Sequence, residues 1–312
     1  MDGMESGIHM GELTGTVLVN GASGMLGTAL RQALAGQGVA VRQLVRGEAR
    51  GEGQIAWNPA AERVVAEPAV LEGCAAAIHL SGASVAGRRW TASYRKEMTE
   101  SRVGTTRALA AMLAGLDRKP EVLVVASAVG IYGDRGNELL DEGSPVGAGF
   151  LAELCRAWEA AAEPARRAGI RVVHARFGVV LGRGGALGKM LPAFKLGLGG
   201  ALGRGRQWMS WVSLEDAVAA LLFAVKTPEL TGAMNVVVPE PVTNAEFTRV
   251  LGRALHRPAV LTAPTVALRL VFGQMAEETL LASQRAVPSR LLQAGFVFRH
   301  ATVEEALREA VR

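Results

Sequence analysis

The chain has 312 residues, of which 49% are hydrophobic and 20% are charged. This composition is typical of a globular protein with one large domain or two closely joined ones, and it excludes a disordered chain. The net charge of +5 comes from 34 basic and 29 acidic residues, which form no long run of one sign. We therefore expect no nucleic-acid partner, because nucleic-acid surfaces usually carry clustered Lys and Arg.

The sequence also allows predictions about the cellular compartment. Cys74 and Cys155 show no CxxC pattern and no metal-ligand spacing with the histidines, so we expect reduced thiols, no metal site and a cytoplasmic protein. Residues 1–14 are polar and Gly-rich, which predicts a loose tail rather than a signal peptide. No apolar run reaches the ~18 residues of a membrane span, so we expect no membrane partner. No pattern predicts the oligomeric state.

Residues 15–180 alternate short apolar runs with helical patterns. The predicted strands are 16–20, 39–45, 75–80, 121–126 and 171–176, with a small hairpin of 54–57 and 63–65 around Asn58-Pro59. The predicted helices are 25–35, 90–116 and 150–168. Short apolar strands that alternate with helices indicate an α/β fold with a doubly wound parallel sheet.

Residues 181–312 have a different pattern, which predicts a smaller C-terminal α+β lobe for the substrate. A Gly-rich stretch surrounds a predicted helix at 187–196. The predictions that follow are strand 208–213, helix 214–225, strand 235–238, helix 243–255 with Thr243 or Asn244 as its cap, and a short strand 296–298 among helices. Part of the sheet can return from this lobe into the core.

A glycine-rich loop joins the first predicted strand to the first predicted helix. Gly21, Gly24 and Gly27 have the spacing G-x-x-G-x-x-G. Glycine permits a tight turn and a close approach of the backbone to a pyrophosphate, and the helix N-terminus offers free N–H groups to that anion. The motif alone is weak, but between a first strand and a first helix it strongly predicts a dinucleotide site.

The end of the second predicted strand discriminates between two cofactors. An acidic residue there binds the ribose hydroxyls of NAD, whereas an Arg suits the 2′-phosphate of NADP. The strand ends Leu44-Val45-Arg46, which predicts NADP(H). The alternative is that Arg46 is a solvated loop cation, and Glu48 close by weakens the prediction.

Further motifs resemble a known family over residues 16–311. They are G-A-S-G-M-L-G at 21–27, I-H-L-S-G at 78–82, S-A-V-G-I-Y-G at 127–133, R-F-G-V-V-L-G-R-G-G at 176–185, Q-W-M-S-W-V-S-L-E-D at 207–216, and the segment from Phe272 through Pro288 to Phe296. With these motifs the chain resembles the atypical extended short-chain dehydrogenases/reductases. More narrowly it is similar to the YfcH-like NAD-dependent epimerase/dehydratase family, which has its own C-terminal segment.

The resemblance implies a Rossmann fold and NADP(H) contacts beyond the glycine loop. On the long helix it implies Glu97 as a ribose acceptor or an orienter of Arg102, and Arg102 as a pyrophosphate partner. The alternative for this pair is a surface salt bridge on one helix. The full predicted cofactor site is Gly21, Ala22, Ser23, Gly24, Met25, Leu26, Gly27, Val45, Arg46, Leu80, Ser81, Gly82, Glu97, Arg102 and Val180.

The family's usual proton-transfer residues are only partly present. Short-chain dehydrogenases use a Ser that holds the substrate oxygen, and a Tyr followed four residues later by a Lys that lowers the phenol pKa. Ser127, at a predicted strand end, matches the Ser. The Tyr–Lys pair is absent, because Leu151 and Cys155 have the corresponding separation on the predicted helix.

Other polar residues are weaker candidates, each with a structural alternative. Tyr132 follows the Ser127 strand and is a second catalytic candidate or a packed loop aromatic. Lys189 is a candidate in the Gly-rich stretch or a solvated surface lysine, and His79 is a base or a hydrogen-bonded structural residue. Glu215-Asp216 are site carboxylates or the first turn of a capped helix.

Two hypotheses for the function remain open. The first is an NADP(H)-dependent oxidoreductase or epimerase that acts on an unidentified small molecule. The second is a non-catalytic NADP(H)-binding redox sensor or interaction protein, and the missing Tyr–Lys pair favours it. A fold alone does not define a reaction, so the sequence leaves the choice open.

Overall fold

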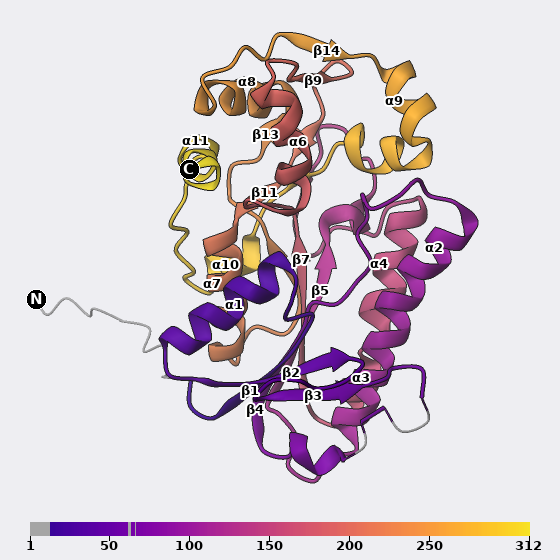
Figure 1. The fold of residues 1–312 in the computed structure, drawn as a ribbon, viewed down its shortest axis with the longest axis vertical. Helices are drawn as coiled ribbons and strands as arrows, with labels where there is room; N and C mark the ends of the chain where they lie inside the picture. The colour runs from indigo at the N-terminus through magenta and orange to yellow at the C-terminus, as the bar shows by residue number, and fades with distance from the viewer. Residues whose placement is uncertain (1–12, 62–63, 66) are drawn as a thin grey trace, which may run out of the picture.

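The structure, a computed structural model, describes residues 13–61, 64–65 and 67–312 (Figure 1). Most of the predicted N-terminal tail lies outside these residues, and so does Arg63 of the predicted hairpin. No helix in the described ranges is long and apolar enough to cross a bilayer. In the same ranges no three His, Cys, Asp or Glu side chains are grouped so that they could hold a metal ion.

A seven-stranded parallel sheet forms the centre of the molecule, in the order β12-β7-β5-β4-β1-β2-β3. Its strands are β1 (Thr16–Asn20), β2 (Ala40–Arg46), β3 (Gln54–Trp57), β4 (Cys74–His79), β5 (Val122–Ala128), β7 (Arg171–Phe177) and β12 (Gly232–Val236). The strand order reverses between β1 and β4, which is where this fold class binds its ligands. The predicted α/β fold with a doubly wound sheet is confirmed.

Helices cover both faces of the sheet because its strands are apolar on both sides (Figure 1). In β1, Val17 and Val19 pack on one face with α1 (Met25–Gly36) and α7 (Leu214–Lys226), while Leu18 packs on the other. The second face is covered by α3 (Thr105–Ala114), α4 (Phe150–Ala160) and α5 (Glu163–Arg167). The continuous apolar pattern of the strands is therefore the pattern of a sheet buried on both faces.

The long helix predicted at 90–116 contains an irregular turn. It consists of α2 (Ala92–Thr99), a π-helical turn η2 (Glu100–Gly104) and α3. Such turns place one extra residue in the helix and often occur at functional sites. Here the turn carries Arg102, which is buried.

The C-terminal part of the chain forms a separate cluster above the carboxyl ends of the strands (Figure 1). It contains β8 (Val179–Leu181), α6 (Gly185–Lys195), β9 (Gly200–Leu202), β10 (Trp208–Met209), β11 (Trp211–Ser213), β13 (Val242–Thr243), α8 (Asn244–Ala254), β14 (Leu261–Ala263), α9 (Thr265–Phe272), the π turn η4 (Ala276–Leu280) and α11 (Val303–Val311). The short helix α10 (Ser289–Gln293) instead packs beside β12 at the edge of the sheet. Two short pieces, β6 (Leu139–Leu140) and β15 (Arg285–Ala286), pair with each other. Thr243 caps α8, as one of the two predicted alternatives had it.

One predicted strand is absent from the structure, and another has a partner that was not predicted. Residues 296–298 form no ladder; the rings of Phe296 and Phe298 meet edge to face at 4.8 Å, and Phe296 packs on Phe223 at 5.3 Å. β3 is not half of a simple hairpin but the parallel edge strand beside β2, and Val65 makes a single antiparallel bridge to Trp57. At 296–298 an apolar run predicted a strand where ring packing decides the structure, whereas the strand predicted at 54–57 is present and has β2 as a further, parallel partner.

Candidate cofactor and active site

The glycine loop leaves β1 and enters α1 through three glycines with different roles. Gly21 has a φ of +84°, and a Cβ there would be 2.7 Å from the backbone carbonyl carbon of Leu80. A Cβ on Gly27 would overlap the carbonyl oxygen of Gly21. Gly24 has an ordinary φ of −71°, and a Cβ there would be 3.5 Å from its nearest neighbour, the carbonyl oxygen of Gly21. The fold therefore needs Gly21 and Gly27, whereas Gly24 leaves open space outside the loop.

The N-terminus of α1 is chemically suited to an anion. Its cap is Gly24, which offers no side chain, and its first turn contains no acidic residue. The first N–H groups of a helix have no partner within the helix, and the helix dipole adds positive potential there. Ser23 and Gly24 are exposed. A pyrophosphate could therefore approach this backbone directly.

Arg46 lies beside this loop, at the end of the neighbouring strand. Asn20 of β1 pairs in register with Leu44 of β2, so the chain leaves both strands side by side. Arg46 is exposed. Glu48, which weakened the NADP(H) prediction, forms an ion pair with Arg50 at 3.3 Å. The position fits a 2′-phosphate contact, and Val45 is half-buried next to it.

A chain of hydrogen bonds ties together the ends of β1 and β4. Ser81 Oγ donates to Asn20 Oδ1 at 2.6 Å, and the amide nitrogen of Asn20 lies 3.0 Å from Nδ1 of His79. His79 Nε2 is 3.3 Å from the hydroxyl of Thr105. Since the Asn20 amide donates to Nδ1, the His79 proton is on Nε2. Burial lowers the pKa of His79 to about 3, so this residue is neutral and structural rather than a base.

Arg102 and Glu97 are not brought together. The guanidinium of Arg102 donates to the carbonyl oxygens of Ala83 at 2.8 Å and Met98 at 3.3 Å, and it stacks over Trp158. Glu97 is exposed, and its Oε2 lies 3.9 Å from Nη1 of Arg88. Arg102 supports the loop after β4, where a Cβ on Gly82 would be 3.0 Å from its guanidinium carbon. This support of the loop differs from the pyrophosphate contact that the resemblance implies.

Ser127 lies at the end of β5 in a buried ionic network. Its hydroxyl donates to Glu159 Oε1 at 2.7 Å. Arg176 donates to both oxygens of Glu159, at 2.8 and 2.9 Å, and the two side chains are only 9% and 14% exposed. Burial alone would raise the pKa of Glu159, but the hydrogen bonds and charge of Arg176 hold it below the ordinary value. The hydroxyl of Ser127 therefore donates its proton to an ionised carboxylate at neutral pH.

Tyr132 belongs to the same network. It is completely buried, donates to Asn235 Oδ1 at 2.7 Å and accepts from Arg176 at 3.1 Å. Burial raises the pKa of its phenol. The structure therefore gives Tyr132 a packing and hydrogen-bonding position, the alternative stated for it above, and not one from which it touches a small molecule.

The face of α4 that carries Leu151 and Cys155 is turned toward Ser127. Cys155 is in contact with Ser127 and with the backbone of Ala128, and Leu151 would lie 3.5 Å from a Cβ on Gly130. Burial raises the pKa of Cys155 to about 12, so this residue is an inert thiol. The positions of the missing Tyr and Lys are thus present and filled with apolar groups.

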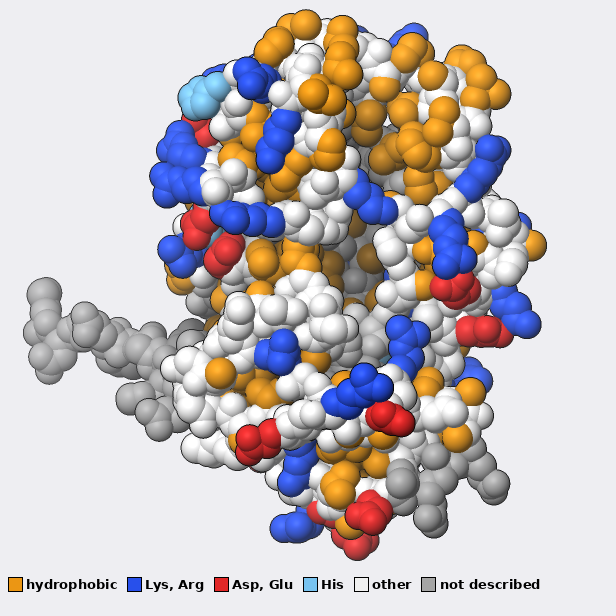
Figure 2. Space-filling model, viewed as in Figure 1, with side chains coloured by type: hydrophobic (Ala, Val, Ile, Leu, Met, Phe, Trp, Pro, Cys, Tyr) orange, Lys and Arg blue, Asp and Glu red, His pale blue; other side chains and the backbone are white. Residues whose placement is uncertain are grey.

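The C-terminal elements approach the same region from above. Met25 of the glycine loop packs against the stretch after β8, where Cβ atoms on Gly182 and Gly184 would be 2.8 and 3.2 Å from its sulfur. Lys189 of α6 donates to the carbonyl oxygen of Ala86, in the loop after β4. Val180 of β8 is half-buried against the core. Figure 2 shows the surface hollowed between this upper part and the sheet.

Asp216 of the Glu215-Asp216 pair has a structural position. It is buried, and its backbone N–H donates to the hydroxyl of Ser213, the N-cap of α7. Its carboxylate accepts the N–H groups of Arg299 and His300 at 2.7 and 3.0 Å. It therefore joins α7 to the C-terminal segment, as the capping alternative predicted.

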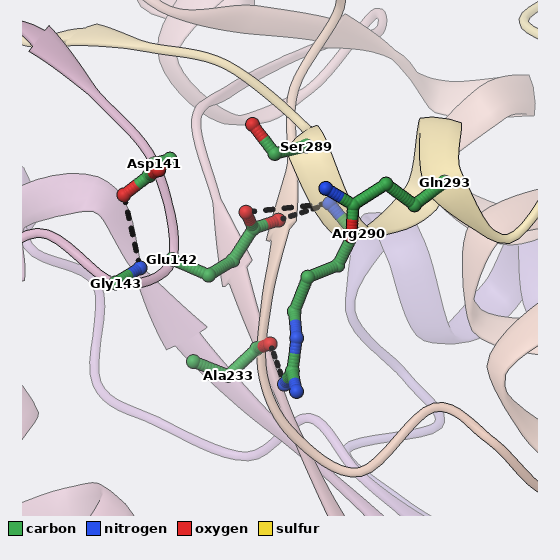
Figure 3. A pocket seen from close by; sticks show the side chains of 7 residues that line it. All are labelled: Asp141, Glu142, Gly143, Ala233, Ser289, Arg290 and Gln293. Atoms are coloured by element: carbon green, nitrogen blue, oxygen red, sulfur yellow. Dashed lines mark hydrogen bonds between the residues drawn. The ribbon is translucent and has the colours of Figure 1, made fainter.

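A cavity of about 350 Å³ lies along the outer edge of β12 (Figure 3). Glu142 accepts the backbone N–H of Asn235 at 2.9 Å, and the guanidinium of Arg290 donates to the carbonyl oxygens of Ala233 and Thr231. Edge strands need their free polar groups covered, or they pair with other chains. The two side chains in this cavity therefore protect the sheet edge.

Comparisons with known proteins agree with this geometry. A model described as the NAD dependent epimerase/dehydratase family matches residues 17–238, and one described as a domain of unknown function, DUF1731, matches residues 263–310. The epimerase family protein MT2273 of Mycobacterium tuberculosis is 46% identical, over 93% of this chain and 96% of that protein. The epimerase family protein YfhF of Bacillus subtilis is 37% identical, over 75% and 77%.

A solved structure shows the same fold at similar length. The human epimerase family protein SDR39U1 (isoform 2), crystallised with NADPH, is 35% identical with a TM-score of 0.85, over 95% of this chain and 98% of that one. The family predicted from the motifs is confirmed. The chain belongs to the NAD-dependent epimerase/dehydratase family and carries a DUF1731 segment near its C-terminal end.

Proposed function

We propose that the chain binds NADP(H) at the glycine loop and acts on a small molecule as an oxidoreductase or epimerase. The observation that carries this proposal is the open N-terminus of α1 at Gly24, with Arg46 beside it at the end of β2. The NADPH-bound crystal structure of human SDR39U1 supports the choice of cofactor. When bound, the cofactor would supply the hydride, and the residues of this chain would hold its phosphates and orient it.

Arg46 is expected to select NADPH over NADH. Replacement Arg46→Ala should weaken NADPH binding by about 1.5–3 kcal/mol, the scale of a hydrogen bond to a charged group. NADH binding should hardly change, because it lacks the 2′-phosphate. Calorimetric titration of both cofactors measures the difference, with Arg107→Ala on the exposed side of α3 as the control. An equal loss for both cofactors would remove Arg46 from this role.

A second candidate function is a non-catalytic NADP(H)-binding protein that senses redox state or docks a partner. The specific observation in its favour is the bond from Ser127 to Glu159. To donate to a substrate oxygen, Ser127 has to turn its hydrogen away from a charged acceptor held in place by Arg176. The positions of the Tyr and Lys offer no replacement donor. This candidate predicts tight cofactor binding without turnover.

Turnover separates the two candidates. We expect wild type to oxidise NADPH in a screen of carbonyl, enone and nucleotide-sugar compounds. With any compound that reacts, Ser127→Ala should lower the rate by about 10²–10³, as for the loss of one donor to a developing oxyanion. Unchanged rates in Ser127→Ala would place the chemistry elsewhere. Inertness across all classes, together with a partner captured only in the presence of NADPH, would favour the non-catalytic function.

A further inference from the structure

One face of the C-terminal part exposes an unusual number of aliphatic side chains. Of the eleven large hydrophobic side chains that are exposed in the described residues, seven come from the turn after α6, from β14 and the residue before it, and from α9. They are Leu196, Leu198, Val260, Leu261, Val266, Leu270 and Val271, called the apolar face below. Isolated exposed aliphatics are ordinary, but a contiguous group marks a surface that another body covers.

The members of the apolar face are neighbours in space. Arg257 donates to the carbonyl oxygen of Lys195 at 3.0 Å, and a Cβ on Gly197 would be 3.6 Å from the ring of Pro258. The turn after α6 therefore lies against the segment that leads into β14, which continues directly into α9. Figure 2 shows hydrophobic side chains gathered over this upper end of the molecule, where Figure 1 has β14 and α9.

Helix α9 is built to present an apolar surface outward. Val266 and Leu270 are one turn apart and are 66% and 72% exposed, whereas Leu268 is the helix's buried residue. A helix that packs only on its own protein normally exposes polar side chains on its outer side. The outer side of α9 has the composition of a contact surface.

The segments that supply the apolar face carry mainly positive charge. Residues 183–214 and 247–276, which supply the face and its surroundings, contain no Asp or Glu. Their basic residues are Arg183, Lys189, Lys195, Arg204, Arg206, Arg249, Arg253, Arg257 and Arg269, and all are exposed. Only Arg249 and Arg269 form ion pairs with carboxylates of the described residues, those of Glu246 and Glu277. The apolar face therefore belongs to segments with an excess of positive charge, and Lys195, Arg257 and Arg269 lie next to its members.

We propose that this face docks on the surface of an anionic lipid bilayer. Aliphatic side chains that enter the headgroup boundary and flanking Lys and Arg that meet anionic lipids are the two components of such binding. A second copy of the chain is a poorer occupant, because a symmetric contact would bring the same cationic surroundings face to face. The absence of a long apolar run excludes a span but not this peripheral contact.

Vesicle sedimentation of the full chain tests the proposal. The probes are vesicles of phosphatidylcholine alone and of equimolar phosphatidylcholine and phosphatidylglycerol, at about 0.05 M and about 0.5 M salt. We expect binding to the anionic vesicles only, and weaker binding at high salt. Val260→Glu should lower the partition into anionic vesicles on the order of tenfold, because it removes an apolar contact and adds a repelled charge.

A matched substitution separates the face from a general effect of charge. Val297 is 85% exposed, nearly as much as Val260 at 83%, and lies outside the apolar face. Val297→Glu should leave vesicle binding unchanged. Equal binding by both variants, or equal binding of wild type to neutral and anionic vesicles, would overturn the proposal. So would sedimentation of wild type without vesicles as a dimer that Val260→Glu dissociates, because the occupant would then be a second copy.

Discussion

Gly24→Val is expected to abolish NADPH binding while the protein stays folded. The backbone at Gly24 has a φ of −71°, which Val adopts without strain, and the nearest atom to a new Cβ is 3.5 Å away. A branched side chain there would occupy the open space outside the loop, where a pyrophosphate has to approach the first N–H groups of α1. The substitution therefore acts on the ligand and not on the fold.

Thermal unfolding with and without NADPH measures this effect. For wild type, NADPH at about 100 times its Kd should stabilise the protein by about 2.7 kcal/mol, and for Gly24→Val the midpoint should not move. Gly36→Val is the matched control, because Gly36 ends the same helix and has open space around it. A ligand-induced rise that survives in Gly24→Val would mean that the pyrophosphate binds elsewhere.

The glycine loop shows what could be predicted from the sequence. The loop, the strand before it and the helix after it are adjacent in the chain, so the local pattern contains all the physical information. The sheet was predictable for a related reason: Val17, Leu18 and Val19 are consecutive apolar residues, which is the pattern of a short strand covered on both faces. The same logic failed at 296–298, where Phe296 and Phe298 pack their rings together and no ladder forms.

The network around Ser127 could not be predicted in the same way. Its bonds join residues far apart in the chain, such as Ser127 with Glu159 and Tyr132 with Asn235, and tertiary packing selects those partners. A signal was present in Arg176, a charged residue within an apolar core strand. Charged residues are rarely buried unless they are paired, so an Arg in this strand indicates a buried acidic partner, which is Glu159.

Breaking the Glu159–Arg176 pair should be the most destabilising change in this region. In Arg176→Ala the carboxylate of Glu159 stays buried and keeps the hydrogen bond from Ser127, but it loses the guanidinium of Arg176. Removing one partner of a buried ion pair typically costs about 3–5 kcal/mol. Chemical denaturation at neutral pH should show a loss of this size. The control is Arg166→Ala, whose pair with Glu163 lies on the surface and should contribute far less.

The pH dependence of this loss distinguishes a buried charge from lost packing. In wild type the pKa of Glu159 is lowered, so the pair stabilises the fold above the ordinary Glu pKa of 4.5 and that contribution disappears as pH falls. In Arg176→Ala, burial remains and Arg176 no longer opposes it, so the Glu159 pKa should rise above 4.5. As pH falls, protonation of Glu159 removes the cost of the unpaired buried charge in the variant. In wild type the same protonation removes the stabilisation from the ion pair with Arg176. The difference in unfolding free energy should therefore shrink between neutral pH and about pH 4. A difference that stays constant with pH would show that Arg176 acts through packing rather than through its charge.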